Sequence, residues 1–257
     1  MKTIVTKYPI ILFCTLNIIV SLLVGLSSDS FNSTPQWSPG LFAILIILCT
    51  KGKVNVYQLI RSTLFACSNL KWYVVALMFP ILFCSLSYVT ISFIEYGKLV
   101  NLEFNHSLCD YTVLFLLMLL GSYCEELGWR GFMLPQLSKR YSPFISSLGV
   151  GIFWGIWHLN ISLGISVSIM YLILVIEFSF ISSWLYIQTK RGLLATIIFH
   201  TSIDICSVAF FERFIMAKPM SSQSMILLYG IIVISFFPMC VGAIKYMLIN
   251  QKLKKRE

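Results

Sequence analysis

Charged side chains are scarce in this sequence. Asp, Glu, Lys and Arg together make up 11% of the 257 residues, hydrophobic residues make up 58%, and the mean hydropathy is +0.86. Soluble domains carry roughly 25% charged residues, so an ordinary soluble protein is excluded. The composition predicts an all-α, polytopic membrane helix bundle. Its length leaves room for about eight spans of roughly 20 residues, packed as a single transmembrane domain over residues 1–257.

Two motifs of metal-binding and redox proteins are also missing. The eight cysteines contain no CxxC pair, and no HExxH motif is present. The first absence argues against a thiolate metal site, and the second against a zinc site preformed on one helix. Only Cys109 is expected to face an oxidising exterior, so disulfides are not expected.

The net charge of +9 does not indicate a nucleic acid partner, because the basic residues form no stripe interleaved with aromatics. They instead flank apolar runs on alternate connections: Lys51, Lys53, Arg61, Lys71, Lys139, Arg140, Lys190 and Arg191. By the positive-inside rule both termini then lie in the cytoplasm, which requires an even number of spans. We expect a multi-pass protein in the lipid bilayer of a bacterial plasma membrane.

Apolar runs predict the individual spans. They lie near residues 8–26, 40–50, 73–95, 111–134, 145–163, 167–188, 192–211 and 225–247. The first run could be a signal peptide, but it is longer than a signal core and lacks a small-x-small cleavage site, so a retained helix is expected. Residues 54–72 alternate polar and apolar residues at helical spacing, which predicts an amphipathic segment at the cytoplasmic interface.

Ionisable residues inside the predicted spans mark a candidate site. Glu125, Glu126 and Arg130 fall within the run 111–134. Each costs roughly 2.5 to 3.5 kcal/mol to insert into a membrane, so such groups usually have a function. Glu126 and Arg130 are i,i+4 neighbours on one helix face. Arg130 is therefore expected to neutralise Glu126, leaving Glu125 as the freer carboxylate.

Two further spans carry polar residues at a comparable depth. His158 follows Trp154 by one helical turn in the run 145–163, so the indole ring can shield or orient the imidazole. His200 and Asp204 are i,i+4 neighbours in the run 192–211. At 1.5 Å per residue, Glu125 and His200 lie roughly 12 to 14 Å from the cytoplasmic ends of their helices, and His158 lies roughly 20 Å from the start of its run. These residues predict one buried polar chamber near the membrane centre or towards its cytoplasmic side.

Three separate spans carry one motif each. In chain order the motifs are Glu125-Glu126-x-x-x-Arg130, Trp154-x-x-x-His158 and His200-x-x-x-Asp204. Together they resemble the type II CAAX prenyl endopeptidase family, which includes bacterial CAAX-protease and bacteriocin-processing membrane proteins. The resemblance covers residues 111–211. Two positions depart from the family pattern, since Trp154 stands where Phe is usual and Asp204 where Asn is frequent.

The resemblance implies an intramembrane endopeptidase whose cavity opens to the cytoplasm and the bilayer. It implies that Glu125 and His158 hold and deprotonate the attacking water, while His200 with residue 204 stabilises the oxyanion. Glu126, Arg130 and Trp154 would support them. An ionised carboxylate cannot donate to an oxyanion, so we expect Asp204 to orient His200 instead.

Metal dependence stays open at this point. Glu125, His158 and His200 are candidate ligands for a catalytic zinc with water in the fourth position. A metal-free glutamate mechanism fits the same residues, and it is favoured because no partner that would orient each histidine as a ligand is evident.

The sequence does not name the substrate. A peptide precursor, a bacteriocin-related peptide or a membrane protein fits the resemblance, with bacteriocin self-immunity as a biological role. An inactive immunity or scaffold membrane protein is the alternative. A proton-coupled transporter is disfavoured because no internal repeat relates two halves of the chain.

Overall fold

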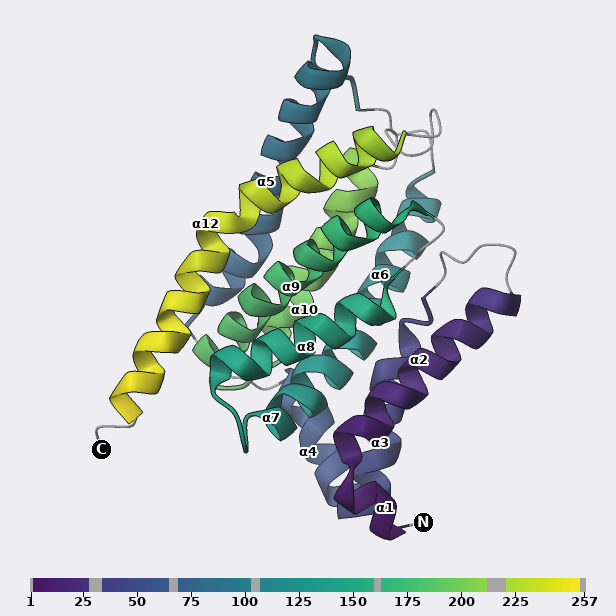
Figure 1. Cartoon of the computed structure of the whole chain (residues 1–257), viewed down its shortest axis with the longest axis vertical. Coiled ribbons are helices and arrows are strands. Elements are labelled where there is room, and N and C mark those ends of the chain that lie inside the picture. The colour runs from purple at the N-terminus through teal and green to yellow at the C-terminus, as the bar shows by residue number, and fades with distance from the viewer. Residues whose placement is uncertain are drawn as a thin grey trace.

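The computed structural model describes residues 2–27, 34–64, 69–102, 107–159, 163–211 and 221–254, and these residues form helices joined by short loops (Figure 1). The predicted fold class, an all-α polytopic membrane bundle, is confirmed. The helices are α1 (Lys2–Lys7), α2 (Pro9–Ser27), α3 (Trp37–Lys51), α4 (Lys53–Leu64), α5 (Lys71–Tyr96), α6 (Leu108–Gly128), η1 (Trp129–Met133), α7 (Leu134–Leu137), α8 (Pro143–Trp157), α9 (Ile165–Gln188), α10 (Leu194–Cys206), η3 (Ser207–Phe211) and α12 (Ser222–Lys254).

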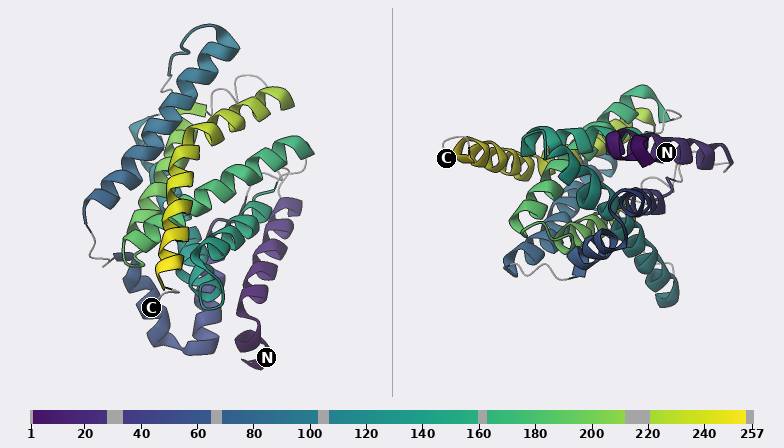
Figure 2. Two further views of the ribbon diagram at one scale, coloured as in Figure 1. Left: turned by 60° about the vertical axis from the view of Figure 1, so that its left-hand side comes forward. Right: turned by 90° about the horizontal axis from the view of Figure 1, so that it is seen from below.

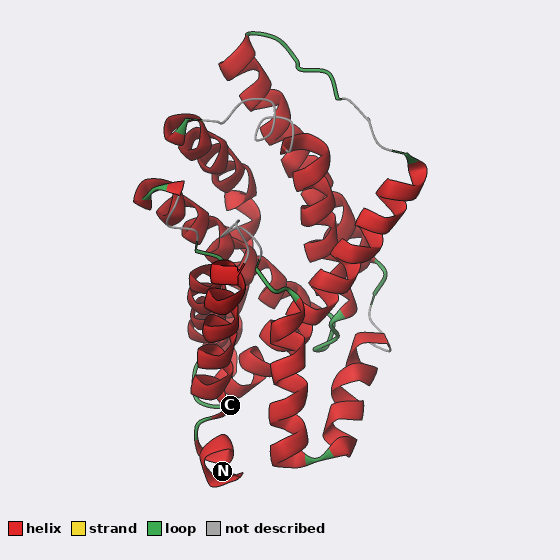
Figure 3. Cartoon of the chain, turned by 90° about the vertical axis from the view of Figure 1, so that its right-hand side faces the viewer, coloured by secondary structure: helices red, strands yellow, loops and turns green. Residues whose placement is uncertain are grey.

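The predicted spans coincide with apolar helices. Five stretches are long and apolar enough to cross a membrane: Lys71–Tyr96, Leu108–Leu137, Ile165–Gln188, Leu194–Phe211 and Ser222–Gln251. The shorter apolar helices Pro9–Gly25, Trp37–Lys51 and Pro143–Trp157 match the other three predictions. Both chain ends lie towards the same end of the bundle (Figures 1 and 3), as an even number of crossings requires. Which side of the membrane they face stays a prediction.

Helix α4 begins where the amphipathic segment 54–72 was predicted, although residues 65–68 of that segment lie outside the described part of the chain. The interfacial position of this segment stays a prediction. Helices α5 and α12 pack together on one side of the bundle, and α2 and α3 pack together on the other (Figures 1 and 2).

One predicted boundary is wrong. The fifth span was expected to run to residue 163, whereas α8 ends at Trp157 and His158 is its C-terminal cap. The His158 backbone N–H still bonds to the carbonyls of Trp154 and Gly155, both at 3.2 Å. Apolar residues continue past this point, so hydropathy alone extends the span too far. His158 therefore lies at the end of α8 rather than within a longer helix.

The helix that carries the two glutamates has a well-defined start and an unusual end. At its start, the Ser107 hydroxyl accepts the Asp110 N–H at 3.2 Å and the Asp110 carboxylate accepts the Ser107 N–H at 3.0 Å, which is a capping box. Beyond Gly128 the helix widens into the π-helical turn η1, Trp129–Met133. Such turns are rare in proteins, and those that occur are often found at functional sites. This one contains Arg130.

Close backbone contact holds α3 against α6. A Cβ atom on Gly40 would lie 2.8 Å from the Cys124 carbonyl oxygen, and one on Gly128 would lie 2.4 Å from the Pro39 Cβ. Small residues permit this approach between membrane helices, where packing rather than burial from water drives association. The contact lies on either side of the glutamate pair, and so it helps to position both carboxylates.

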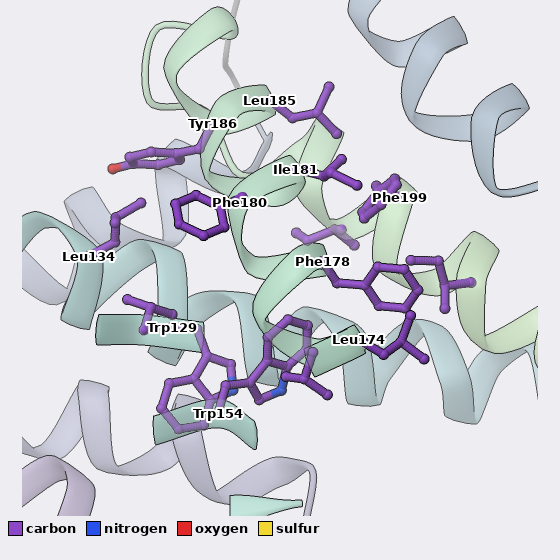
Figure 4. Packing of buried hydrophobic residues seen from close by; sticks show 14 of the residues in the cluster. Trp129, Leu134, Trp154, Leu174, Phe178, Phe180, Ile181, Leu185, Tyr186 and Phe199 are labelled. Atoms are coloured by element: carbon purple, nitrogen blue, oxygen red, sulfur yellow. The ribbon is translucent and has the colours of Figure 1, made fainter. Parts of the chain in front are cut away.

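Aromatic side chains pack the centre of the bundle. The Phe178 ring of α9 lies 6.1 Å from Phe199 of α10 and 5.0 Å from Phe236 of α12, measured between ring centroids. Leu174 and Ile181 of α9 belong to the same buried cluster (Figure 4). This packing joins α9, α10 and α12 into a wall beside the polar residues.

Candidate active site

Glu125 is fully buried and is held by helix α8. Its Oε2 accepts a hydrogen bond from the Trp154 indole N–H at 2.8 Å and lies 3.7 Å from His158 Nε2. A buried carboxylate without partners is strongly destabilising. Trp154, which the sequence indicated as a neighbour of His158, thus binds the carboxylate directly. The structure brings the first two motifs together.

Glu126 connects the first motif to the third. Its Oε1 accepts from Arg130 Nη1 at 2.8 Å, as the i,i+4 spacing predicts, and lies 3.0 Å from His200 Nδ1. Glu126 and Arg130 are fully buried. The Arg130 guanidinium also lies 4.3 Å from the centre of the Trp154 ring, a cation–π contact. One carboxylate and one guanidinium therefore join η1, α8 and α10.

Asp204 lies beside His200, but at the other ring nitrogen. The His200 Nε2 to Asp204 Oδ2 distance is 3.8 Å, too long for a hydrogen bond. The Ser122 hydroxyl of α6 donates to the same Asp204 oxygen at 2.9 Å. The expected orienting contact of His200 is thus made by Glu126 rather than by Asp204. Ser122 was not predicted, although it lies one turn before the glutamates on the same helix.

Aromatic rings enclose both histidines. The Trp154 ring centroid lies 5.2 Å from that of His200 and 6.1 Å from that of His158. His158 also contacts Trp157 at 4.7 Å and Tyr171 at 5.9 Å between centroids. Tyr171 comes from α9, and no spacing pattern in the sequence singles it out.

A cavity of about 250 Å³ opens beside these residues. Its polar lining includes His158, His200 and Asp204, and the remaining lining is mostly aromatic and aliphatic: Trp154, Tyr171, Leu174, Val175, Phe178, Phe199, Ile203, Phe211, Leu228, Tyr229 and Ile232. Glu125 is not part of the lining, because its side chain is fully buried whereas that of His158 is 15% exposed. Glu125 contacts the cavity wall through His158 and Trp154.

The candidate metal ligands do not converge. Among the described residues, no group of three or more His, Cys, Asp or Glu side chains is arranged to hold a metal ion. His158 faces Glu125, whereas His200 directs Nδ1 at Glu126. The donor set Glu125, His158 and His200 in this arrangement does not fit a three-ligand zinc site. Whether the protein binds a metal stays a prediction.

Comparison with known proteins agrees with the three motifs. The family model described as type II CAAX prenyl endopeptidase Rce1-like matches residues 107–206. This segment of the chain is similar to that family. The Rce1-like segment starts at the capping box of α6 and ends at the last residue of α10, so it contains every predicted site residue. The resemblance predicted from the sequence is confirmed.

One curated relative is the CAAX prenyl protease 2 of Methanococcus maripaludis. It is 29% identical over an alignment of 108 residues, with 37% of this chain and 40% of the relative covered. The chain thus matches less than half of that protein's length.

Proposed function

We propose that this protein is an intramembrane endopeptidase in which Glu125 and His158 activate a water molecule for peptide-bond hydrolysis. The observation that carries the proposal is the 3.7 Å separation of Glu125 Oε2 and His158 Nε2 at the cavity wall. A single water can hydrogen-bond to both atoms at roughly 2.8 Å from each. The Trp154 N–H holds the carboxylate in place for this task.

The chemistry requires one base that later acts as an acid. Glu125 takes a proton from the water as the oxygen attacks the peptide carbonyl carbon, and the carbonyl electron pair moves onto its oxygen. The protonated Glu125 then returns the proton to the amide nitrogen as the C–N bond breaks. The products are a carboxylic acid and an amine, and Glu125 regains its starting state.

His200 supplies the charge stabilisation in this proposal. A doubly protonated imidazole carries a donor on each nitrogen. His200 then gives its Nδ1–H to Glu126 and presents its Nε2–H to the cavity, where the oxyanion develops. The Asp204 carboxylate lies 3.8 Å from His200 Nε2 and stabilises the positive charge of the ring. The Ser122 hydroxyl holds this carboxylate by a hydrogen bond.

The mechanism needs no bound metal. Glu125 as a proton acceptor and His200 as a donor provide the two functions that a zinc ion otherwise supplies. A zinc-bound His200 would coordinate through Nε2 and keep its Nδ1 contact with Glu126, but among the described residues Glu125, His158 and His200 are not arranged as one metal-holding group. We therefore propose the glutamate-dependent reaction.

We propose a peptide precursor, a bacteriocin-related peptide or a membrane protein as the substrate, cleaved within a bacterial plasma membrane. The role in self-immunity follows from the bacteriocin-processing branch of the family. Both termini are proposed to lie in the cytoplasm, in accord with the basic connections at their end of the bundle.

The membrane peptidome provides the test. Cells that produce the native chain are compared with cells that produce Glu125→Gln, with Glu95→Gln as control, because Glu95 is an exposed carboxylate on α5. The proposal expects precursor peptides to accumulate only in the Glu125→Gln cells. If immunity persists and no peptide changes in them, the protein is a binding or scaffold protein and the peptidase proposal is wrong.

A further inference from the structure

A second and larger hollow lies at the end of the bundle that holds the C-terminus. It has a volume of about 1020 Å³ and is bordered by α7, the start of α8, the end of α9 and the last turns of α12, which come together at the lower left of Figure 1. We call it the basic groove, and it is lined by Leu134, Pro135, Ser138, Lys139, Arg140, Tyr141, Ser142, Pro143, Ser147, Tyr186, Ile187, Lys190, Arg191, Tyr246, Met247, Asn250 and Gln251. It shares none of these residues with the cavity beside His158.

Four cations line the basic groove, and no Asp or Glu does. Lys139 and Arg140 precede α8, Lys190 and Arg191 follow α9, and all four are exposed. Within the described ranges of the chain none of them forms an ion pair. Partial desolvation and the nearby charge of Lys51 lower the pKa of Lys139, so a fifth cation adds to the positive potential. The groove therefore carries uncompensated positive charge.

The turn that carries two of the cations has a specially held backbone. Lys190 and Arg191 have φ angles of 53° and 68°, in the left-handed region that residues with side chains rarely occupy. The buried Thr189 hydroxyl bonds to the carbonyls of Leu185 at 2.8 Å and Gly192 at 3.0 Å, and the Arg191 N–H bonds to the Tyr186 carbonyl at 2.8 Å. Such conformations persist only when the surrounding structure supports them, and they cluster at functional sites.

A helix start adds to the positive side of the groove. Helix α8 begins there, with Ser142 as its N-cap and Pro143 as its first residue, and it is 15 residues long. The N-terminal end of a helix carries a partial positive charge that favours anions. The four side-chain cations and this helix end thus surround one space from two separate segments of the chain.

The remaining lining is apolar or aromatic. Leu134, Ile187 and Met247 also line the groove, of which only Ile187 is partly exposed, and three tyrosines border the same space. Leu134 and Tyr186 can be followed in Figure 4. The groove is formed by the ends of membrane-spanning helices, where lipid headgroups meet the hydrocarbon region. A ligand that combines an anionic head with apolar chains matches this lining better than an acidic peptide, which has no counterpart for the aliphatic residues.

We propose that the basic groove binds the phosphate headgroup of an anionic phospholipid. Basic pockets between membrane helices on the cytoplasmic side bind such headgroups in general. Lys139, Arg140, Lys190 and Arg191 hold the phosphate, and the partly exposed Ile187 contacts the start of the acyl chains. This site is independent of the proposed peptidase activity.

The test measures lipid binding to the purified full-length protein by native mass spectrometry. Short-chain phosphatidylglycerol, phosphatidylcholine, glycerol phosphate and a short acidic peptide are added in turn. Lys190→Asn with Arg191→Asn removes two charges, and Asn tolerates the left-handed backbone. The matched control is Lys7→Gln with Lys53→Gln, which removes two exposed charges outside the groove.

The proposal expects phosphatidylglycerol to bind the native protein and phosphatidylcholine to bind far less. Each basic residue at a membrane surface contributes roughly fivefold in affinity, so the Asn pair should bind roughly thirtyfold more weakly. The control pair should bind as the native protein does. A Lys139→Gln, Arg140→Gln pair should show a similar loss, which separates lost charge from a disturbed α9 turn.

Three results would overturn the proposal. Equal weakening in the control pair would mean that the attraction is to the whole basic surface rather than to the groove. Glycerol phosphate binding as tightly as phosphatidylglycerol would identify a site for soluble anions. Binding of the acidic peptide without lipid would identify a peptide site.

Discussion

At the scale of single residues, this membrane protein buries the two neighbouring carboxylates Glu125 and Glu126 and gives each of them polar or charged partners. Glu126 contacts Arg130 and His200, and Glu125 contacts Trp154 and His158. Removing one partner of a buried pair leaves the other uncompensated, which costs more than the pair itself contributes. Substitutions at different residues of this cluster should therefore affect activity and stability separately.

Glu125→Gln is expected to remove activity and keep the fold. The amide has the shape of the carboxylate and its oxygen can still accept the Trp154 N–H, but it cannot take a proton from water. We expect cleavage to fall at least about 10² to 10⁴-fold with little change in yield, measured by peptide cleavage with purified protein. Full activity of this variant at normal protein levels would mean that Glu125 is not the base.

Arg130→Ala is expected to act mainly on stability. The change leaves Glu126 buried beside His200 alone and removes the contact with Trp154. We expect a loss of roughly 3 to 5 kcal/mol in the free energy of unfolding, seen as a lower yield and a lower midpoint of thermal unfolding in detergent. Arg140→Ala, at an exposed arginine, is the control. A stable Arg130→Ala protein would contradict the importance of the ion pair.

His200→Gln tests the proposed oxyanion donor. Glutamine cannot present the second positive donor that the mechanism requires. We expect kcat to fall about 10² to 10³-fold while KM changes little, as for loss of an oxyanion-hole donor. If the variant instead binds an uncharged substrate analogue more weakly while kcat shows no specific change, His200 has a purely structural role.

At the scale of helices, the sequence predicted the features that depend on residues close together in the chain. Hydropathy located the eight apolar helices, and the i,i+4 rule paired Glu126 with Arg130. The end of α8 was missed because apolar residues continue beyond it. The π-helical turn η1 was not predicted either, since no residue type specifies it and its widening depends on the helices packed around it.

The α3–α6 contact gives a prediction at this scale. A methyl group on Gly128 would meet the Pro39 Cβ at 2.4 Å, so Gly128→Ala must push the two helices apart. We expect a loss of about 1 to 3 kcal/mol in stability and a matching fall in activity, measured by thermal unfolding and cleavage. Gly230→Ala is the control, because nothing lies within 4 Å of its added methyl group. Equal stability of the two variants would contradict the tight contact.

At the scale of the whole molecule, the bundle brings together residues that the sequence could place only in a common layer. Trp154 and Glu125 are 29 positions apart, Glu126 and His200 are 74 apart, and Ser122 and Asp204 are 82 apart. Depth arguments predicted one chamber, but which carboxylate meets which histidine depends on helix rotation and tilt. That is why Asp204 was expected to hold His200 where Glu126 does.

Metal removal tests the proposed mechanism on the intact protein. Because Glu125, His158 and His200 do not converge on one point, we expect dialysis against a chelator to leave cleavage unchanged. Elemental analysis of the purified protein should show well under one zinc per chain. Stoichiometric zinc whose loss stops cleavage would establish the metal alternative. The control is the same dialysis with the chelator saturated by zinc.

The shielded position of Glu125 has a consequence for the fate of the cleaved chain. The rings of Trp154 and His158 contact this carboxylate and line the space that receives the peptide, whereas Glu125 itself does not line it. Only a very small nucleophile can be activated there, and bulky amines are kept out. We therefore expect the new carboxyl end to be released free, without transfer to a second peptide, even when amines are abundant.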